Sequence, residues 1–485
     1  MPLQPQLCVV VTGGTMEEIR RGRDAASGAD IVEVRLDYAD RPDAAAALEG
    51  RRTPVVVTCR ARFEGGHFAG SEEERRRVLE NAIAHGAEYV DVEAAASFAS
   101  DLIRSTGGRR IVLSEHNFEG VPADLPGRFD ALRRRGAEIA KLAVHVDRLD
   151  QLIPLFELGR SIDGAANGES HILIAMGSAG LASRILAARL GSRWTYAGDN
   201  VAPGQLTIGR LLQDFRFRRI APDAALYAVA GNPIVHSRSP VMHNAGFAAL
   251  GMNAVYIPLE ARDAEDFVRF ARAANLRGAS ITTPFKVSLL PYLDDIEPLA
   301  ARVGAINTLL VRDGRWIGAN TDVDGFLEPL TGRIDLRGAR AIVLGSGGAA
   351  RGVAVALADR GAVVTVSART PEAAREIAKS VSGTIAEFPP VNEPWDLLVN
   401  ATTSGSTANP GNPMAGARLT GKIVYDLVYS PRGTELLKDA KAQGCDTIGG
   451  IEMLVAQAER QFERWTGQRP PAGLFASAVA GGDHA

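Results

Sequence analysis

The segment Glu138-Ile-Ala-Lys-Leu-Ala-Val144 is a short apolar run that carries one cation, Lys141, at a position expected to face inward. Lysine is almost never fully buried without a partner. Desolvation disfavours the ammonium, and a neutral amine forms Schiff bases with ketones. A second apolar run, Leu113-Ser-Glu-His-Asn-Phe118, carries His116 near its end. The two runs favour imine chemistry with a histidine proton shuttle. From this pair alone, a lysine that reaches solvent from an ordinary strand remains the alternative.

Apolar runs typical of β-strands recur throughout the first 220 residues. They begin near residues 7, 31, 54, 88, 110, 138, 171 and 193, and helix-like stretches such as residues 71–84 separate them. Eight strands that alternate with helices are typical of a (β/α)8 TIM barrel. We therefore expect an α/β protein whose N-terminal half is such a barrel.

Charged side chains share faces of several of these strands. Successive side chains of a strand alternate between its two faces, so Glu33 lies on the face of Arg35, and Asp91 on the face of Glu93. Arg60 closes the third run. Charges inside a barrel are costly unless they meet one another or a polar ligand, and the carboxyl ends of the strands form the active site of this fold. Ion pairing alone would explain any one of these charges, but their convergence from five strands predicts an active site.

Composition and charge favour a soluble enzyme with at least two domains. The chain has 485 residues and a net charge of −3. It therefore lacks the excess of basic residues that is typical of nucleic-acid-binding proteins. Its three cysteines, Cys8, Cys59 and Cys445, have neither metal-ligand nor disulfide spacing, so we expect a reducing compartment, the cytoplasm, and no metal. Residues 1–12 lack the features of a signal peptide, and no apolar run approaches the ~20 residues that span a bilayer.

A set of motifs in the first half is specific when taken together. They are Glu33-Val-Arg35-Leu-Asp37, Thr58-Cys-Arg60, Glu64-Gly-Gly66, Glu115-His-Asn-Phe118, Ala140-Lys-Leu142, Ser183-Arg184 and Ala202-Pro-Gly-Gln205. On these motifs, residues 5 to 215 or so resemble the type I 3-dehydroquinate dehydratases. Many members of that family carry serine where Val201 stands, so one substrate or lid contact differs here.

This resemblance implies a role for each matching residue. Lys141 would form the Schiff base with the substrate ketone, His116 would be the general acid and base, and Glu64 would orient His116. Arg184 would pair with the substrate carboxylate, because a planar guanidinium suits that contact. The residues implied at the ring hydroxyls and around the imine are Glu33, Arg35, Arg60 and Gln205.

The second half begins near Pro222, after a basic stretch that we expect to be the end of a helix. Its clearest motif is Ala341-Ile-Val-Leu-Gly345-Ser-Gly347-Gly-Ala-Ala350-Arg, a strand, a G-x-G-x-x-A turn and a helix to about Arg360. This is the dinucleotide fingerprint in its required context, and backbone amides at such a helix start can bind a pyrophosphate. A second strand, Val363–Ser367, leads to Arg369, where NAD enzymes usually carry an acidic residue. Arg369 therefore favours NADP, unless it is only a solvated loop arginine.

The motifs from Leu226 to about Ala480 resemble shikimate dehydrogenase. They are Ser237-Arg-Ser239-Pro, Ile281-Thr-Thr-Pro-Phe-Lys286, Gly304-Ala-Ile-Asn307-Thr, Asn320-Thr-Asp322, Asn400-Ala-Thr, Asp426-Leu-Val-Tyr429 and Gly450-Ile-Glu-Met-Leu-Val-Ala-Gln457. The resemblance implies that Lys286 and Asp322 are the catalytic pair. The substrate-binding residues that it implies are Ser237, Ser239, Thr282, Asn307, Tyr429 and Gln457. The cofactor-binding residues are Gly345, Ser346, Gly347, Gly348, Ala349, Arg369, Thr370, Leu427 and Gly450. Ala368 stands where the family often has asparagine, so one adenosine-side contact differs.

Together the two halves predict a bifunctional shikimate-pathway enzyme that dehydrates 3-dehydroquinate and reduces 3-dehydroshikimate with NADPH. The expected domains are a barrel over 1–221, a substrate-binding lobe over 222–323, a Rossmann NADP lobe over 324–449, and C-terminal helices over 450–485 that return to the substrate lobe. We expect small-molecule substrates, a monomer or homodimer, and no nucleic-acid or membrane partner. Two alternatives remain: a quinate-preferring NAD(P) dehydrogenase in the second half, and a catalytically silent metabolite sensor.

Overall fold

The computed structural model describes residues 4–162, 170–198, 205–234, 237–430 and 433–481. They form two compact units, one of Met1–Pro240 with Asn253–Leu276 and one of Val241–Met252 with Arg277–Ala485. Val201 and residues 202–204 of the predicted substrate motif lie outside the described residues. The boundaries of the four predicted domains stay predictions.

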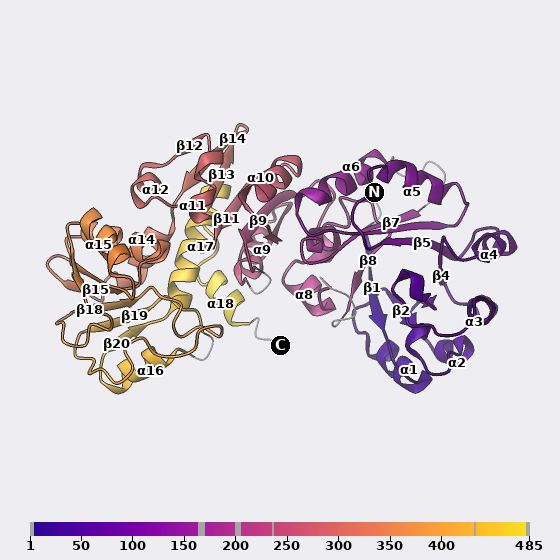
Figure 1. Cartoon of the computed structure of the whole chain (residues 1–485), viewed down its shortest axis with the longest axis horizontal. Coiled ribbons are helices and arrows are strands. Elements are labelled where there is room, and N and C mark those ends of the chain that lie inside the picture. The colour runs from indigo at the N-terminus through magenta and orange to yellow at the C-terminus, as the bar shows by residue number, and fades with distance from the viewer. Residues whose placement is uncertain (1–3, 163–169, 199–204, 235–236, 431–432, 482–485) are drawn as a thin grey trace. The chain divides into compact units, whose positions relative to one another are not determined.

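The first unit contains a sheet of eight parallel strands wound into a barrel (Figure 1). Its strands are β1 (Gln6–Val11), β2 (Ile31–Arg35), β3 (Val55–Thr58), β4 (Tyr89–Glu93), β5 (Ile111–Asn117), β6 (Ile139–His145), β7 (Ser170–Met176) and β8 (Trp194–Ala197). Their order is β7-β6-β5-β4-β3-β2-β1-β8. Each predicted run begins within one residue of a strand, so the predicted TIM barrel is confirmed.

The gap between β7 and β8 is bridged by backbone and side-chain bonds. Arg193 N donates to His171 O at 2.7 Å, and Leu173 N donates to Ser192 Oγ at 3.0 Å. Apolar side chains from alternate strand positions, among them Val56, Val112 and Trp194, fill the interior. The packed core leaves the carboxyl ends of the strands for polar groups.

Helices cover the outside of the barrel in Figure 1. They are α1 (Met16–Ala25), α2 (Ala44–Leu48), α3 (Glu72–Ala84), α4 (Ala99–Thr106), α5 (Leu125–Arg133), α6 (Ile153–Ser161), α7 (Leu181–Ile185) and α8 (Ile208–Gln213), with 3-10 turns η1 (Leu36–Tyr38), η2 (Arg62–Glu64), η3 (Asp150–Leu152) and η4 (Phe217–Arg219). A capping box starts α3: Glu74 N donates to Ser71 Oγ at 3.2 Å, and Ser71 N donates to Glu74 Oε2 at 2.8 Å. The basic stretch before Pro222 is not one continuous helix, because Arg216 adopts a left-handed backbone with φ of 53°.

The remainder of the first unit is a parallel strand pair and a helix that packs on the barrel. β9 (Ala225–Gly231) pairs with β10 (Ala254–Glu260), and α10 (Ala264–Ala273) follows. Asp150 N, in the barrel, donates to Asp266 Oδ1 of α10 at 2.8 Å. Arg189 donates to the carbonyl oxygens of Ala224 and Ala274. This segment is therefore bonded to the barrel, although it follows Pro222 in the sequence.

The second unit includes a group of short strands with mixed directions. β13 (Thr308–Arg312) pairs antiparallel with β11 (Gly278–Ile281) and β14 (Arg315–Ala319), and β12 (Asp295–Ile296) pairs parallel with β14. The connecting helices and turns are α11 (Phe285–Ser288), η5 (Leu290–Tyr292), α12 (Pro298–Val303), α13 (Asp322–Leu327) and η6 (Glu328–Leu330), and α9 (Ser239–Ala249) precedes them.

A six-stranded parallel sheet forms the rest of this unit (Figure 1). Its order, β17-β16-β15-β18-β19-β20, is the doubly wound order 3-2-1-4-5-6. The strands are β15 (Arg340–Leu344), β16 (Val363–Ser367), β17 (Thr384–Ala386), β18 (Leu397–Asn400), β19 (Ile423–Asp426) and β20 (Asp446–Ile448). The helices are α14 (Gly348–Asp359), α15 (Pro371–Ser380), α16 (Glu435–Ala442), α17 (Gly450–Thr466) and α18 (Leu474–Ala480). The predicted Rossmann fold is confirmed.

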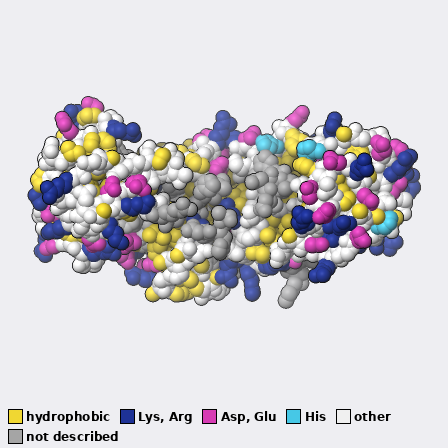
Figure 2. Space-filling model, turned by 90° about the horizontal axis from the view of Figure 1, so that it is seen from below, with side chains coloured by type: hydrophobic (Ala, Val, Ile, Leu, Met, Phe, Trp, Pro, Cys, Tyr) yellow, Lys and Arg dark blue, Asp and Glu magenta, His cyan; other side chains and the backbone are white. Residues whose placement is uncertain are grey.

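Acidic and basic side chains are interspersed over the face shown in Figure 2. Among the described residues, no helix is long and apolar enough to cross a membrane. Within the same ranges, no cluster of three or more His, Cys, Asp or Glu side chains is arranged to hold a metal ion.

Candidate active sites

A cavity of about 250 Å³ in the first unit brings together all eight predicted barrel residues. Those that line it are Glu33, Arg35, Arg60, Glu64, His116, Lys141, Arg184 and Gln205. Several come from strand ends, where Glu33 and Arg35 project from β2, His116 from β5 and Lys141 from β6. The alternation of side chains along the strands thus directs these groups into one space.

Lys141 is buried and held by a carboxylate. Its Nζ donates to Asp91 Oδ2 at 2.9 Å and lies 4.5 Å from the centroid of the Tyr196 ring. Arg60 binds the other oxygen of Asp91 at 2.8 Å, and Ser114 Oγ donates to that oxygen at 2.7 Å. Burial acts to raise the pKa of Asp91, but Arg60 and Lys141 outweigh it and hold this pKa below its usual value. Asp91 is therefore a carboxylate that stabilises a cation at the lysine nitrogen.

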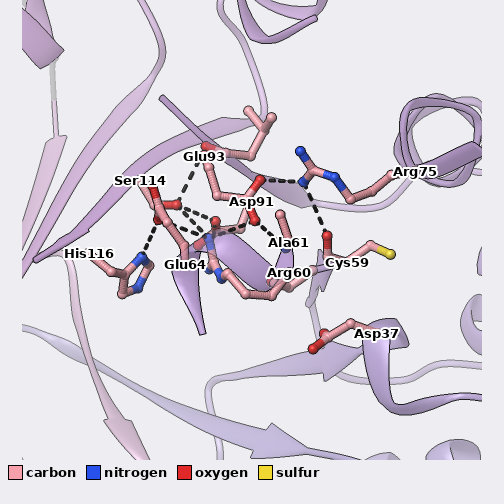
Figure 3. Close-up of polar contacts among 12 residues, drawn as sticks. Asp37, Cys59, Arg60, Ala61, Glu64, Arg75, Asp91, Glu93, Ser114 and His116 are labelled. Atoms are coloured by element: carbon pink, nitrogen blue, oxygen red, sulfur yellow. Dashed lines mark hydrogen bonds and ion pairs between the residues drawn. The ribbon is translucent and has the colours of Figure 1, made fainter. Parts of the chain in front are cut away.

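His116 is bonded to Glu64 (Figure 3). The distance from His116 Nδ1 to Glu64 Oε2 is 2.8 Å. Burial, with the charges of Arg60 and Lys141, holds the pKa of His116 well below its usual value. Burial also raises the pKa of Glu64 to about 8. The pair can therefore take up or release a proton near neutral pH, while Nε2 of the imidazole remains for a ligand.

The remaining barrel residues differ in how they are held. Arg35 forms a bidentate pair with Asp37, at 2.8 Å and 2.7 Å, and Thr58 Oγ1 donates to Glu33 Oε1 at 2.6 Å. Arg184 on α7 is only 3% exposed, and its Nε has no hydrogen-bond partner among the described residues. Burial lowers its pKa to about 10, so it remains a cation at neutral pH. A buried guanidinium with unused donors is suited to an anionic ligand.

Some polar groups of this site had no predicted role. The sequence placed Asp91 and Glu93 on one face but assigned them no contact, and it did not single out Ser114 or Tyr196. Their partners lie far along the chain: Asp91 and Lys141 are 50 residues apart. The signal available in the sequence was the pair of acidic residues, Asp91 and Glu93, on one face of an otherwise apolar strand.

The second candidate site has Lys286 and Asp322 at its centre. Lys286 Nζ donates to Asp322 Oδ2 at 2.6 Å, and Asn307 Nδ2 donates to Asp322 Oδ1 at 2.8 Å. Asn307 Nδ2 also lies 3.3 Å from Gln457 Oε1. Pro284 immediately precedes the short helix that carries Lys286. The structure thus brings together Lys286, Asp322, Asn307 and Gln457.

The other predicted substrate residues lie at the ends of elements. Thr282 follows β11 and is half-buried, and Tyr429 follows β19 and is half-buried. Ser237 and Ser239 belong to the first unit, where Ser239 N donates to Ser237 Oγ at 3.3 Å at the start of α9.

The predicted nucleotide turn connects β15 to α14. Gly345 has a φ of +114°, a conformation that favours glycine, and Gly347 and Gly348 are exposed at the start of α14. Positions where a Cβ on Gly347 or Gly348 would stand are open. Ser346 belongs to the same turn, and Ala349 is the second residue of α14. This arrangement leaves backbone amides at a helix start accessible to a phosphate.

The groups beyond this turn also fit a nucleotide. Arg369 and Thr370 follow β16 and are exposed, and none of the described side chains forms an ion pair with Arg369. A Cβ on Gly450 would stand 2.5 Å from Leu427 O, so glycine permits this close approach. Asn400 Nδ2 donates to Asp426 Oδ1 at 2.9 Å, joining the carboxyl ends of β18 and β19. The end of β15, next to β18, is the point at which strand order reverses and dinucleotides bind in this fold.

Known proteins are similar to both halves. The family model for type I 3-dehydroquinase matches residues 7–222, that for the shikimate dehydrogenase substrate binding domain matches 229–309, and that for the shikimate 5'-dehydrogenase C-terminal domain matches 450–479. A bifunctional 3-dehydroquinate dehydratase/shikimate dehydrogenase, chloroplastic, of Arabidopsis thaliana is 32% identical over 97% of this chain and 83% of its own.

Two further relatives match the second half. Shikimate dehydrogenase (NADP(+)) of Shouchella clausii is 39% identical over 50% of this chain and 94% of its own length. The crystal structure of shikimate dehydrogenase from Aquifex aeolicus is 34% identical, covers 54% of this chain and 99% of that one, and superposes with a TM-score of 0.51. With both halves matched in one relative over most of its length, the chain belongs to the family of bifunctional 3-dehydroquinate dehydratase/shikimate dehydrogenases.

Proposed function

We propose that this chain catalyses two consecutive reactions of the shikimate pathway. The barrel dehydrates 3-dehydroquinate to 3-dehydroshikimate, and the dehydrogenase half reduces 3-dehydroshikimate to shikimate with NADPH. The observation that carries the first reaction is the convergence of Lys141, His116 and Arg184 on one cavity. The second reaction rests on the Lys286–Asp322 pair and on the doubly wound sheet with its glycine turn.

In the dehydration, Lys141 attacks the substrate ketone as a free amine, and loss of water gives an iminium. The iminium makes the neighbouring carbon more acidic, and His116 removes a proton from it. Expulsion of the β-hydroxyl follows, with His116 returning a proton to the departing oxygen, and hydrolysis of the iminium releases the product and the lysine. Asp91, bonded to Lys141 Nζ, stabilises the cationic imine.

Substrate binding in the barrel is assigned to polar groups that line the cavity. Arg184 holds the carboxylate, since its guanidinium is buried and its Nε lacks a described partner. Glu33, Arg35, Arg60 and Gln205 bind the ring hydroxyls and balance charge around the imine. Glu64 fixes the orientation of His116 through Nδ1.

The dehydrogenase half has the groups that NADP requires. Gly345, Gly347 and Gly348 allow the diphosphate to approach the start of α14, and Arg369 offers a cation for the 2′-phosphate. Ser346, Ala349, Thr370, Leu427 and Gly450 complete the proposed cofactor contacts. Bound NADPH supplies the hydride for the ketone carbon.

In that reduction, Lys286 donates a proton to the ketone oxygen as the hydride arrives, and Asp322 orients Lys286 through its bond to Nζ. Asn307 fixes the second oxygen of Asp322. The proposed substrate contacts are Ser237, Ser239, Thr282, Asn307, Tyr429 and Gln457. Arg369 argues against a dehydrogenase that prefers NAD, and the presence of Lys141, His116, Lys286 and Asp322 argues against a silent sensor.

We further propose a cytoplasmic protein that is a monomer or a homodimer. Cys8, Cys59 and Cys445 are buried and unpaired with one another, which suits a reducing compartment. The Arabidopsis relative is chloroplastic, so location has to be measured. Cell fractionation and light scattering on the purified chain test these two points.

One assay tests both activities. Purified protein is incubated with 3-dehydroquinate, with and without NADPH, and products are identified by mass spectrometry. Without NADPH, 3-dehydroshikimate should accumulate; with NADPH, shikimate should form as NADPH is consumed. Failure to consume 3-dehydroquinate under either condition would overturn the barrel assignment, and accumulation of 3-dehydroshikimate despite NADPH would overturn the dehydrogenase assignment.

A further inference from the structure

Arg75 on α3 is a fully buried cation outside the catalytic groups named above. Its side chain forms an ion pair with Glu93 of β4 and donates to Cys59 O at 3.2 Å (Figure 3). It also binds both carboxylate oxygens of Glu72, at 2.7 Å and 2.8 Å. Burying a charge is costly, and removing one partner of a buried pair leaves the other uncompensated. Arg75 therefore compensates the negative charge of Glu93.

Glu93 connects Arg75 to the active site. Its Oε1 accepts from Ala61 N at 2.9 Å and lies 3.4 Å from Arg60 NH1. Arg60 in turn lies between two buried carboxylates, because its NH2 is 2.8 Å from Asp91 Oδ1. Asp91 is the residue that binds Lys141. In Figure 3, Arg75 reaches this chain of charges from the helix, whereas the other groups project from the barrel strands and their ends.

The pairing of Glu93 determines whether Arg60 lies closer to Asp91 or to Glu93. With Arg75 present, Glu93 is already paired, and Arg60 remains closest to Asp91. Without Arg75, the unpaired Glu93 would draw Arg60 away, and the charge of Asp91 would act on Lys141 alone. A more strongly held ammonium supplies less free amine for attack on a ketone.

We propose that Arg75 is a positioning residue for the imine chemistry of the barrel: by pairing with Glu93 it keeps Arg60 on Asp91, and so limits the negative charge that Lys141 meets. This inference rests on the proposed dehydratase function. The groups that surround Lys141 from the neighbouring strands are Cys8 (β1), Glu33 (β2), Arg60 (after β3), Asp91 (β4), His116 (β5) and Tyr196 (β8). Among them, Arg60 and Asp91 are the pair on which Glu93 acts.

The test measures the pH dependence of imine trapping in the full-length protein. Borohydride and 3-dehydroquinate are added at a series of pH values, and the adduct on Lys141 is quantified by mass spectrometry. Arg75→Met should raise the pH of half-maximal trapping by about one unit, which is roughly tenfold in rate on the acidic side. Arg75→Lys keeps the charge and should restore the wild-type midpoint. Glu72→Gln, which removes the exposed partner of Arg75, is the matched control and should leave the midpoint unchanged.

A charge-removal cycle separates this role from a structural one. Glu93→Gln should leave the midpoint at or below that of the wild type, and adding Arg75→Met to Glu93→Gln should return it to about the wild-type value. The double variant contains no unpaired Glu93 charge, and Glu93→Gln alone keeps the proposal falsifiable even if Arg75→Met does not fold. A rise of the midpoint in Glu93→Gln, or in the double variant above the wild type, would overturn the proposal.

Two further outcomes are decisive. If Arg75→Met lowers the thermal midpoint but leaves the pH profile of trapping unchanged, Arg75 is only structural and the proposal fails. If the wild type forms no adduct at any pH, the Schiff-base function itself fails. Dehydrogenase activity, measured in every variant, reports that the other half of the chain is intact.

Discussion

Nζ of Lys141 lies 2.9 Å from Oδ2 of Asp91, and both side chains are buried in the barrel. The predicted imine-forming lysine is therefore a partner in a charge network that also contains Arg60, Ser114 and, through Glu93, Arg75. The network explains how the barrel accommodates a lysine that sequence periodicity directs inward, since buried charges require partners.

Replacement of Lys141 by alanine should abolish dehydration and leave reduction of 3-dehydroshikimate near the wild-type rate. The reason is that Lys141 and the Lys286–Asp322 pair belong to different compact units. Initial rates of both reactions in the same preparation check this. The wild type treated with 3-dehydroquinate and borohydride should gain the ligand mass on Lys141, and a requirement for added metal would contradict the mechanism.

The stability of the barrel should decrease with rising pH because of Glu64. Its pKa is raised to about 8 in the fold from an unfolded value of 4.5, so its contribution is fully present below pH 4.5 and is lost as pH rises through about 8. Glu64→Gln should remove this part of the pH dependence of the free energy of unfolding, which is on the order of a few kcal/mol. Urea unfolding followed by pulse labelling of the buried Cys8 and Cys59 measures it at pH 5 and pH 9. An equal effect of the substitution at both pH values would show that Glu64 is ionised throughout.

Substitution of Arg369 by alanine should raise the KM for NADPH far more than that for shikimate, and should narrow the preference over NADH. Loss of a charge-assisted phosphate contact removes about 1.5–3 kcal/mol, which is roughly tenfold or more in KM. Arg375→Ala, in the following helix and already paired with Glu372, is a control that should behave as the wild type. Equal use of both cofactors by the wild type would refute the role given to Arg369.

Gly450→Ala should weaken NADPH binding and lower stability by about 1–3 kcal/mol. Its new Cβ would stand 2.5 Å from Leu427 O, so either the start of α17 or the segment after β19 must move. Gly449→Ala is the neighbouring control, because the nearest atom to its Cβ would be Leu437 Cδ1 at 3.8 Å. The thermal midpoint and the KM for NADPH should differ between the two variants. Identical values would show that the close approach of Gly450 to Leu427 is not required.

Chains 1–221 and 222–485, expressed separately, should be soluble and each should keep its own half-reaction. Domains of about 220 and 260 residues are large enough to fold alone. The cut severs the bonds of Asp150 to Asp266 and of Arg189 to Ala224 and Ala274, so the thermal midpoint of the barrel should decrease modestly. A folded fragment that is inactive until the other is added would mean that a site is shared.

The sequence by itself determined the local elements and the chemistry available to them. Apolar runs of strand length separated by helical stretches gave the barrel strands to within one residue, because strand and helix periods are local properties of the chain. The glycine turn after Leu344 likewise identified β15, α14 and β16, since its spacing requires a strand, a tight turn and a helix start. Arg216 was a local exception: its left-handed backbone, between the end of α8 and η4, has no glycine to signal it.

Tertiary structure decided which charges meet. Glu64 joins His116 across 52 residues, and Asp91 joins Lys141 across 50, because winding the barrel brings these strand ends together. In the sequence, Arg75 is one of several arginines in a charged helix, but in the structure it is fully buried against Glu93. Helix periodicity indicates which residues share a face, but only the packing of α3 on the barrel determines that this arginine faces the interior, where low polarity makes its pairing matter most.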